Sequence, residues 1–134
     1  MPEESQRVNA VRAVYERWGE GDFRAGIDLY DPQITFVMRP EFPDAGTYQG
    51  LDGVRDYMRG FLEPWVRITI AAEEIIGAGD SVVVAVRQVG TGEGSGAATE
   101  FRYFHVWTFR GDHVVRWESV RERGEALALV GIEA

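Results

Sequence analysis

The chain has 134 residues and a formal net charge of −8, from 22 acidic and 14 basic side chains. It contains no cysteine and no lysine, so thiol nucleophiles, cysteine-bound zinc and lysine Schiff bases are excluded. The acidic balance argues against a nucleic-acid partner, because phosphate contacts require a basic surface. The length predicts one domain over residues 1–134, with a core large enough to fold without covalent staples.

The sequence offers no sign of export or of membrane insertion. Residues 1–6 (MPEESQ) are acidic and lack the apolar run of a signal peptide, and no segment approaches the apolar length of a membrane span. We therefore expect a cytoplasmic protein with no membrane partner.

The first half of the chain predicts three helices and one strand. Ser5 is a candidate N-cap for an amphipathic first helix, and Asp22 is a candidate N-cap for a short second one that Asp31-Pro32 stops. The predicted elements are a helix over residues 5–19, a helix over 22–30, a strand over 34–38, a proline-rich loop over 39–46, and a helix over 51–61.

The second half of the chain predicts long strands and a closing helix. Gly111-Asp112 separates two runs that are rich in β-branched and aromatic residues, which is a strong hairpin signal. The predicted strands cover residues 66–76, 81–89, 98–110 and 113–120, and a short amphipathic helix lies within 121–131. Helices followed by an antiparallel meander predict an α+β fold in which the early helices cover one face of the sheet.

Both faces of the predicted sheet are largely apolar. Residues 82–86 (VVVAV) and 101–109 do not alternate between apolar and polar, as strands with one solvated face would. We therefore expect a second subunit to bury the other face, which predicts a homodimer.

Four short segments carry a resemblance to a known family. They are Gly21-Asp22 after the first helix, residues 29–32 (LYDP) before a strand, residues 50–54 (GLDGV) at the start of the third helix, and residues 107–117 (WTFRGDHVVRW) at the hairpin. With the order of elements, they resemble the NTF2-like superfamily, and within it the SnoaL-like branch, over nearly the whole chain. The resemblance implies a curved antiparallel sheet wrapped around three helices from the N-terminal half, with a short C-terminal helix, forming a cone with an apolar cavity. Members include isomerases, epoxide hydrolases and polyketide cyclases, and also domains that only bind or dimerise.

The catalytic residues of ketosteroid-isomerase-like relatives are mostly absent. Those relatives place a tyrosine on the first helix, a general-base aspartate at the end of the first strand and a protonated aspartate on the penultimate strand. The matching positions here hold Val14, Met38 and His105. Steroid isomerisation is therefore not expected, because the base and one oxyanion donor are missing.

Two other branches of the superfamily point to the last strand. Relatives that resemble limonene epoxide hydrolase use an arginine and two aspartates, where this chain has Val86, Gln88 and Ser119, which cannot activate water in the same way. SnoaL-like cyclases rely on an acidic residue in the last strand, for which Glu118 is the nearest candidate. The predicted catalytic residues are thus His105, Glu118 and Ser119.

His105 is the central candidate because it lies in an aromatic strand. Burial there would lower its pKa and keep it a neutral base, although a histidine that only bonds across the sheet is an alternative. Its predicted neighbour across the turn is Glu118, and such a pair would form an oriented base. A one-residue bulge at the turn would instead place Trp117 and Ser119 on the His105 face.

Aromatic and soft side chains are numerous enough to line a cavity for a planar, apolar ligand, although ordinary core packing is the alternative for each. No metal site is expected, because the two histidines are isolated, and no cofactor is expected. The predicted ligand-binding residues are Val14, Trp18, Met38, Phe42, Tyr57, Phe61, Gln88, Tyr103, Trp107 and Trp117.

Two functions follow from these predictions. The first is a cofactor-free enzyme, an isomerase, cyclase or hydrolase, that applies acid-base catalysis to a hydrophobic, ring-containing metabolite. The second is a non-catalytic ligand-binding or dimerisation module of the same fold. A histidine in a pocket with a second polar group within hydrogen-bond reach would favour the enzyme.

Overall fold

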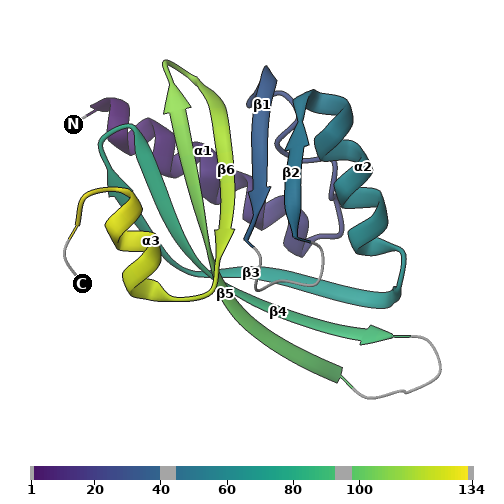
Figure 1. The fold of residues 1–134 in the computed structure, drawn as a ribbon. Coiled ribbons are helices and arrows are strands. Elements are labelled where there is room, and N and C mark those ends of the chain that lie inside the picture. Colours follow the sequence, from purple (N-terminus) through teal and green to yellow (C-terminus); the bar gives the residue numbers. More distant parts are fainter. Residues whose placement is uncertain (1, 40–44, 93–97, 133–134) are drawn as a thin grey trace.

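The structure is a computed structural model that describes residues 2–39, 45–92 and 98–132. In these residues, three helices accompany one curved sheet of six strands, which does not close on itself (Figure 1). The helices are α1 (Pro2–Gly19), α2 (Gly50–Leu62) and α3 (Arg123–Leu129). The strands are β1 (Tyr30–Met38), β2 (Gly46–Gln49), β3 (Trp65–Ala78), β4 (Ser81–Gly92), β5 (Ala98–Arg110) and β6 (His113–Val120). This is the α+β layout that the resemblance implies.

The sheet is mixed, whereas a purely antiparallel sheet was predicted. The strand order is β2-β1-β6-β5-β4-β3, and β1 runs parallel to β6, while every other neighbouring pair is antiparallel. The parallel pair arises because the first strand enters the sheet beside the last one and runs in the same direction. It places Phe36 opposite Trp117 and Met38 opposite Ser119.

The first half of the chain differs from the prediction at three places. α1 begins at Pro2, a residue suited to the first turn of a helix, so Ser5 lies inside the helix and is not its cap. Residues 23–29 form turns in place of the predicted second helix. Gly26 has a φ of +104°, which a right-handed helix cannot accommodate, and the Asp22 carboxylate accepts a hydrogen bond from the Arg24 N–H in a local turn. Strand β2 was not predicted.

The long strands and the hairpin were predicted well. β5 and β6 have the predicted bounds, and Gly111 adopts a φ of +63° in the two-residue turn between them. The closing helix α3 and the third predicted helix, α2, are also confirmed within a few residues.

One face of the sheet, the inner face, packs against α1 and α2. Its core is dominated by rings: Trp107 and Trp117 stack at 4.8 Å between centroids, and Phe36 lies 4.2 Å from Trp117. α1 contributes Val11, Tyr15 and Trp18 to this cluster, and α2 contributes Val54 and Tyr57. The two helices are thereby fixed to the sheet by aromatic packing.

The opposite, outer face is covered in part by α3. Val83, Val106 and Val120 are buried there together with Ala126 of α3. In Figure 1, α3 lies beside β5 and β6, away from α1. Part of the two-sided apolar pattern that predicted a second subunit is therefore satisfied within the chain.

No helix in the described part of the chain is long and apolar enough to cross a membrane.

We expect the Ala126→Asp substitution to lower the free energy of unfolding by about 3 kcal/mol, because it places an unpaired charge in the outer-face cluster. Ala128→Asp is the matched control, since Ala128 lies on the exposed side of the same helix and its substitution should cost under about 1 kcal/mol. Urea unfolding followed by tryptophan fluorescence measures both. Equal losses in the two variants would contradict the packing of α3 described above.

Candidate functional site

The strand register places His105 among inner-face residues of three strands. His105 of β5 lies opposite Val84 of β4 and opposite Ser119 of β6. The ring of Trp117 is 5.1 Å from the imidazole, edge to face. His105 and Ser119 are both buried, with 4% and 0% of their surfaces exposed. The structure therefore brings two of the three predicted catalytic residues together.

Glu118 does not join them, and the predicted His105–Glu118 pair is wrong. Thr108 pairs with Arg116 and Phe109 with Val114, so Val115 is an extra residue that forms a β-bulge. The bulge shifts the register by one residue and turns Glu118 to the outer face, opposite Val106. The alternative register that a bulge would produce, with Trp117 and Ser119 beside His105, is the one observed.

Glu118 is instead held by arginines on the outer face. Its two carboxylate oxygens accept hydrogen bonds from Arg39, at 3.1 Å, and Arg116, at 2.8 Å. Arg39 also lies 3.9 Å from Glu125 of α3. Glu118 thus connects the end of β1 with β6 and the start of α3, which is a structural role.

A hydrogen-bonded triad connects His105 to α1. The hydroxyl oxygen of Tyr15 lies 2.6 Å from Nδ1 of His105 and 2.9 Å from Nε1 of Trp107. An indole N–H can only donate, so the Tyr15 oxygen accepts from Trp107. In the tautomer that leaves Nδ1 unprotonated, the Tyr15 hydroxyl donates its own proton to that nitrogen. The neutral imidazole then carries its proton on Nε2, which makes that nitrogen a hydrogen-bond donor.

Burial keeps both members of this pair uncharged. It lowers the pKa of His105 to about 3, as the sequence analysis expected in direction. It also raises the pKa of Tyr15 well above its ordinary value. At neutral pH, His105 is therefore a neutral group with a weak affinity for a further proton.

Tyr15 is the residue that the sequence analysis missed. The alignment with the isomerase-like relatives placed Val14 at the position of their helix tyrosine, and Val14 is buried in the core. The signal was available one residue further on, because Tyr15 belongs to the apolar stripe of α1 and carries the only hydroxyl group in it.

The predicted ligand-binding residues mostly contact one another. Val14, Trp18, Met38, Tyr57, Trp107 and Trp117 belong to the buried inner core, and Phe61 and Tyr103 pack against it. Gln88 is buried, and its Oε1 accepts a hydrogen bond of 2.8 Å from the Tyr103 hydroxyl. Phe42 lies outside the described residues.

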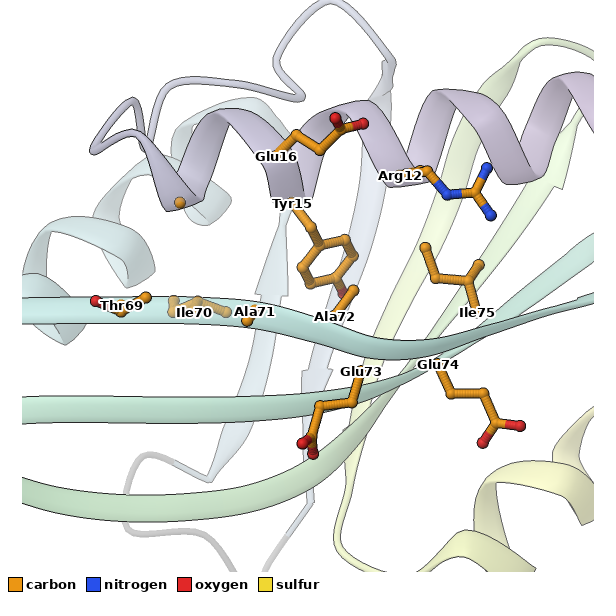
Figure 2. A pocket seen from close by; sticks show the side chains of 11 residues that line it. Arg12, Tyr15, Glu16, Thr69, Ile70, Ala71, Ala72, Glu73, Glu74 and Ile75 are labelled. Atoms are coloured by element: carbon orange, nitrogen blue, oxygen red, sulfur yellow. The ribbon is translucent and has the colours of Figure 1, made fainter.

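Open space borders the triad along α1. A groove of about 420 Å³ lies between α1 and β3, and Tyr15 projects from the helix across it (Figure 2). Arg12, Glu16 and Gly19 line the helix side, and residues 69–75 line the strand side. Figure 2 shows Glu73 and Glu74 directed away from α1, so Tyr15 and the apolar side chains of β3 form the interior of the groove.

Within residues 2–39, 45–92 and 98–132, no three histidine, aspartate or glutamate side chains gather where they could hold a metal ion.

The fold and the site together define the class of protein: an NTF2-like α+β domain with a buried, uncharged polar cluster on the inner face of its sheet. The model of the SnoaL-like domain matches residues 11–117. The chain therefore belongs to the SnoaL-like domain family, as the resemblance in the sequence indicated. A search of curated proteins finds no match.

Solved structures share the fold over nearly the full chain. An NTF2-like protein from Burkholderia thailandensis E264 is 28% identical, with a TM-score of 0.74 over 92% of this chain and 95% of that one. An NTF2-like protein of unknown function from Burkholderia pseudomallei K96243 is 22% identical, with a TM-score of 0.76 over 94% and 98%. TerC, co-crystallized with polyporic acid, is 20% identical, with a TM-score of 0.74 over 93% and 98%.

We expect His105 to make the stability of the protein depend on pH. Its folded-state pKa of about 3 lies below its ordinary value of 6.5, so between these pH values the unfolded chain binds a proton that the folded chain does not bind. The contribution of the neutral His105 to the free energy of unfolding is fully present above pH 6.5. It is lost as the pH falls towards 3, by up to about 1.4 kcal/mol per pH unit. Urea unfolding at a series of pH values from neutral downwards measures this slope.

Carboxylates also titrate at acidic pH, so the test compares variants. His105→Gln should flatten the slope between pH 6.5 and 5, whereas His113→Gln should leave it unchanged, because His113 is exposed beside the turn. Identical slopes for wild type and His105→Gln would contradict the buried, neutral state of His105.

Proposed function

We propose that the protein binds an uncharged, ring-containing small molecule on the inner face of its sheet. One observation carries the proposal. Of the four buried polar or charged residues in the described chain, Gln88, His105 and Ser119 lie on the inner face and are neutral, and only Glu118, on the outer face, is charged. An interior of rings and neutral hydrogen-bonding groups accepts an apolar molecule with one or two polar atoms.

The electrostatics of this interior select against charged ligands. A buried charge is costly unless an opposite charge or several hydrogen bonds compensate it. The inner-face positions of β5 and β6 from Tyr103 to Phe109 and from Val114 to Ser119 carry aromatic, aliphatic or neutral polar side chains. The overall charge of −8 further favours a small neutral partner over nucleic acid.

The groove between α1 and β3 supplies a route of entry in this proposal. Tyr15 lines this groove and is hydrogen-bonded to His105, so a ligand in the groove contacts one member of the triad. TerC, which shares the fold, was co-crystallized with polyporic acid. That likeness supports a ring-containing ligand here.

Catalysis without a cofactor is the second candidate, and the buried Tyr15–His105 pair favours it. Isomerase and cyclase reactions that depend on polarising a ligand oxygen fit a neutral imidazole whose Nε2 donates. Hydrolysis fits less well, because a base must take a proton from water, and a histidine with a pKa of about 3 does so weakly. In this arrangement His105 acts as a donor rather than as the general base that the sequence suggested.

We expect neutral ring compounds to quench the fluorescence of the buried tryptophans and to raise Tm. A suitable panel contains naphthoquinones, aromatic polyketides, monocyclic terpenes and 1-indanone, with benzoate as a charged comparison. Tyr15→Phe should weaken binding by about threefold to tenfold, because it removes the proton that fixes the His105 tautomer. Tyr48→Phe, on β2, is the matched control. A panel in which benzoate binds and no neutral compound does would contradict the proposal.

The homodimer remains a prediction, and we propose the part of the outer face that α3 leaves open as its interface. Ala85 and Phe104 are only partly buried there, opposite each other on β4 and β5. Ion pairs flank them: Arg87 with Glu100, and Arg102 with Glu73. In a two-fold symmetric dimer this face would meet a second copy of itself. A small apolar centre with charged side chains of both signs around it fits such a contact.

We expect light scattering at micromolar concentration to give the mass of a dimer. Ala85→Arg should shift the mass towards the monomer, because it adds an unpaired charge at the centre of the proposed interface. Thr47→Arg, on the exposed edge strand β2, should leave the mass unchanged. A monomeric mass for the wild-type chain would rule the interface out.

A further inference from the structure

Strand β3 forms one edge of the sheet, and part of its backbone faces an open groove. In the strand order, β3 comes last and pairs with β4. Every residue of 69–75 lines the groove between α1 and β3. Side chains alternate between the two faces of a strand, so a groove lined by consecutive residues is lined by the edge of the strand itself. The groove therefore exposes backbone N–H and C=O groups of β3.

This edge is free along a regular segment of limited length. Among the described residues, no hydrogen bond joins the backbone of 67–72 to anything but β4. Proteins commonly interrupt such an edge, because it can pair with another chain. Here the register with β4 shifts between Trp65 and Arg67 and again between Ala72 and Glu74. The two irregularities leave residues 67–72 as a regular strand, which is long enough to pair with a short extended peptide.

On the other side of the groove, α1 supplies a charged rim. Arg12, Glu16 and Gly19 lie four and then three residues apart along the helix, so they share the side of α1 that lines the groove. Arg12 donates a hydrogen bond of 2.9 Å to Asn9 of the same helix. Neither Arg12 nor Glu16 forms an ion pair with a described residue, and both are exposed. The rim thus presents one cation and one anion that are not compensated there.

The spacing of these two charges matches that of an extended chain. Four residues of a helix rise by about 6 Å, and two residues of a strand span about 6.6 Å. Residues two apart in a strand also point to the same face. A strand laid along β3 can therefore direct one side chain towards Arg12 and the next side chain on that face towards Glu16.

α1 and β3 run in opposite directions along the groove. Glu4, near the start of α1, accepts a hydrogen bond of 2.9 Å from the N–H of Gly79, just beyond the end of β3. Tyr15, near the end of α1, projects towards Ala72 in the middle of β3 (Figure 2). A strand that is antiparallel to β3 consequently runs in the same direction as α1, and it passes Arg12 before Glu16.

We propose that this groove binds an extended peptide segment of a partner protein, which adds to β3 as an antiparallel strand and carries an acidic residue two positions before a basic one. Antiparallel pairing is the more stable arrangement per residue. The acidic side chain then meets Arg12 and the basic side chain meets Glu16. Main-chain hydrogen bonds to β3 supply affinity, and the two charges fix the direction and register of the peptide. This partner is distinct from the ring-containing ligand, and the inference does not rest on the proposed function.

A second copy of β3 would match the rim less well than such a peptide. The side chains of β3 on the face that α1 covers are apolar, namely Ile68, Ile70 and Ala72. Self-pairing of β3 would bring these side chains towards the rim and leave both of its charges without partners. A segment with opposite charges two residues apart compensates both, so the charges of the rim favour a separate partner.

The test uses two acetylated and amidated peptides that differ only in the order of their charges, SVETKTV and SVKTETV. We expect the wild-type protein to bind SVETKTV at least about fivefold more tightly than SVKTETV, measured by isothermal titration calorimetry. The double variant Arg12→Glu, Glu16→Arg should invert this preference. Asp52→Arg with Arg55→Glu, which exchanges the charges of an exposed pair on α2, is the matched control and should leave the preference unchanged.

Amide hydrogen exchange, followed by NMR, tests whether the peptide pairs with the backbone of β3. Alternate N–H groups of an edge strand point away from the sheet and are free to exchange with solvent. Saturating SVETKTV should slow the exchange of alternate amides within 67–72 by at least about tenfold. Exchange in β2, the strand at the other edge of the sheet, should stay unchanged.

Several outcomes would overturn the inference. They are equal affinity of the wild-type protein for the two peptides, failure of both to bind, an unchanged preference in the double variant, and unslowed exchange within 67–72. Light scattering tests the second copy as the occupant, since saturating SVETKTV should leave the mass of the protein unchanged apart from the bound peptide. A mass that halves would show that β3 pairs with another copy and would also overturn the inference. None of these outcomes bears on the binding of ring compounds, which is measured separately.

Discussion

The extra residue in β6, Val115, decides what each face of the sheet can do. Because side chains alternate along a strand, the bulge determines on which side every later residue of β6 lies. With it, Trp117 and Ser119 face the aromatic interior and Glu118 faces Arg39 and Arg116. Without it, the carboxylate would enter an apolar core and the indole would lie among the arginines. Burying an unpaired carboxylate costs several kcal/mol, so the interior chemistry and the stability of the fold depend on the same residue.

The Tyr15 hydroxyl group, on the helix side of the core, affects both the position of α1 and the protonation of His105. It accepts from Trp107 and donates to His105, and so it joins α1 to β5 at two points. The contact that positions the helix also selects the tautomer of His105. Burial then keeps the pair neutral, because it lowers the pKa of His105 and raises that of Tyr15. A change in the packing of α1 would therefore alter the tautomer of His105 even if β5 itself did not move.

Much of this fold could be predicted from the sequence, because its signals are local. The Gly111-Asp112 turn, the bounds of β5 and β6 and the amphipathic α2 follow from turn chemistry and periodicity. The bulge at Val115 left no such signal, because positions 114 and 115 both hold valine, an ordinary strand residue. The bulge places Glu118 on the outer face and Ser119 on the inner face, the reverse of an unbulged hairpin. The coverage of the outer face by α3 and the parallel pairing of β1 with β6 are tertiary features that no local pattern encodes. His105 was found because a lone titratable group stands out in an aromatic strand, and Tyr15 was missed because a tyrosine in an apolar stripe resembles ordinary core.

Buried polar side chains in the interior fall into two groups, those with a hydrogen-bond partner and those without one. Tyr15, Trp107 and Gln88 all have partners, so the fold is able to satisfy polar groups in this core. Ser119 and Trp117 lie a few ångströms from that network and have none, although smaller or apolar residues would fit a purely structural role. Arg39 also has an unpartnered atom, but its side chain reaches solvent and its other nitrogens hold Glu118, so its guanidinium is compensated. Local inconsistency in an otherwise consistent structure is expected where function opposes stability. By that criterion, the inner face of β6, rather than the charged outer face, is where polar groups are kept without a structural partner among the described residues.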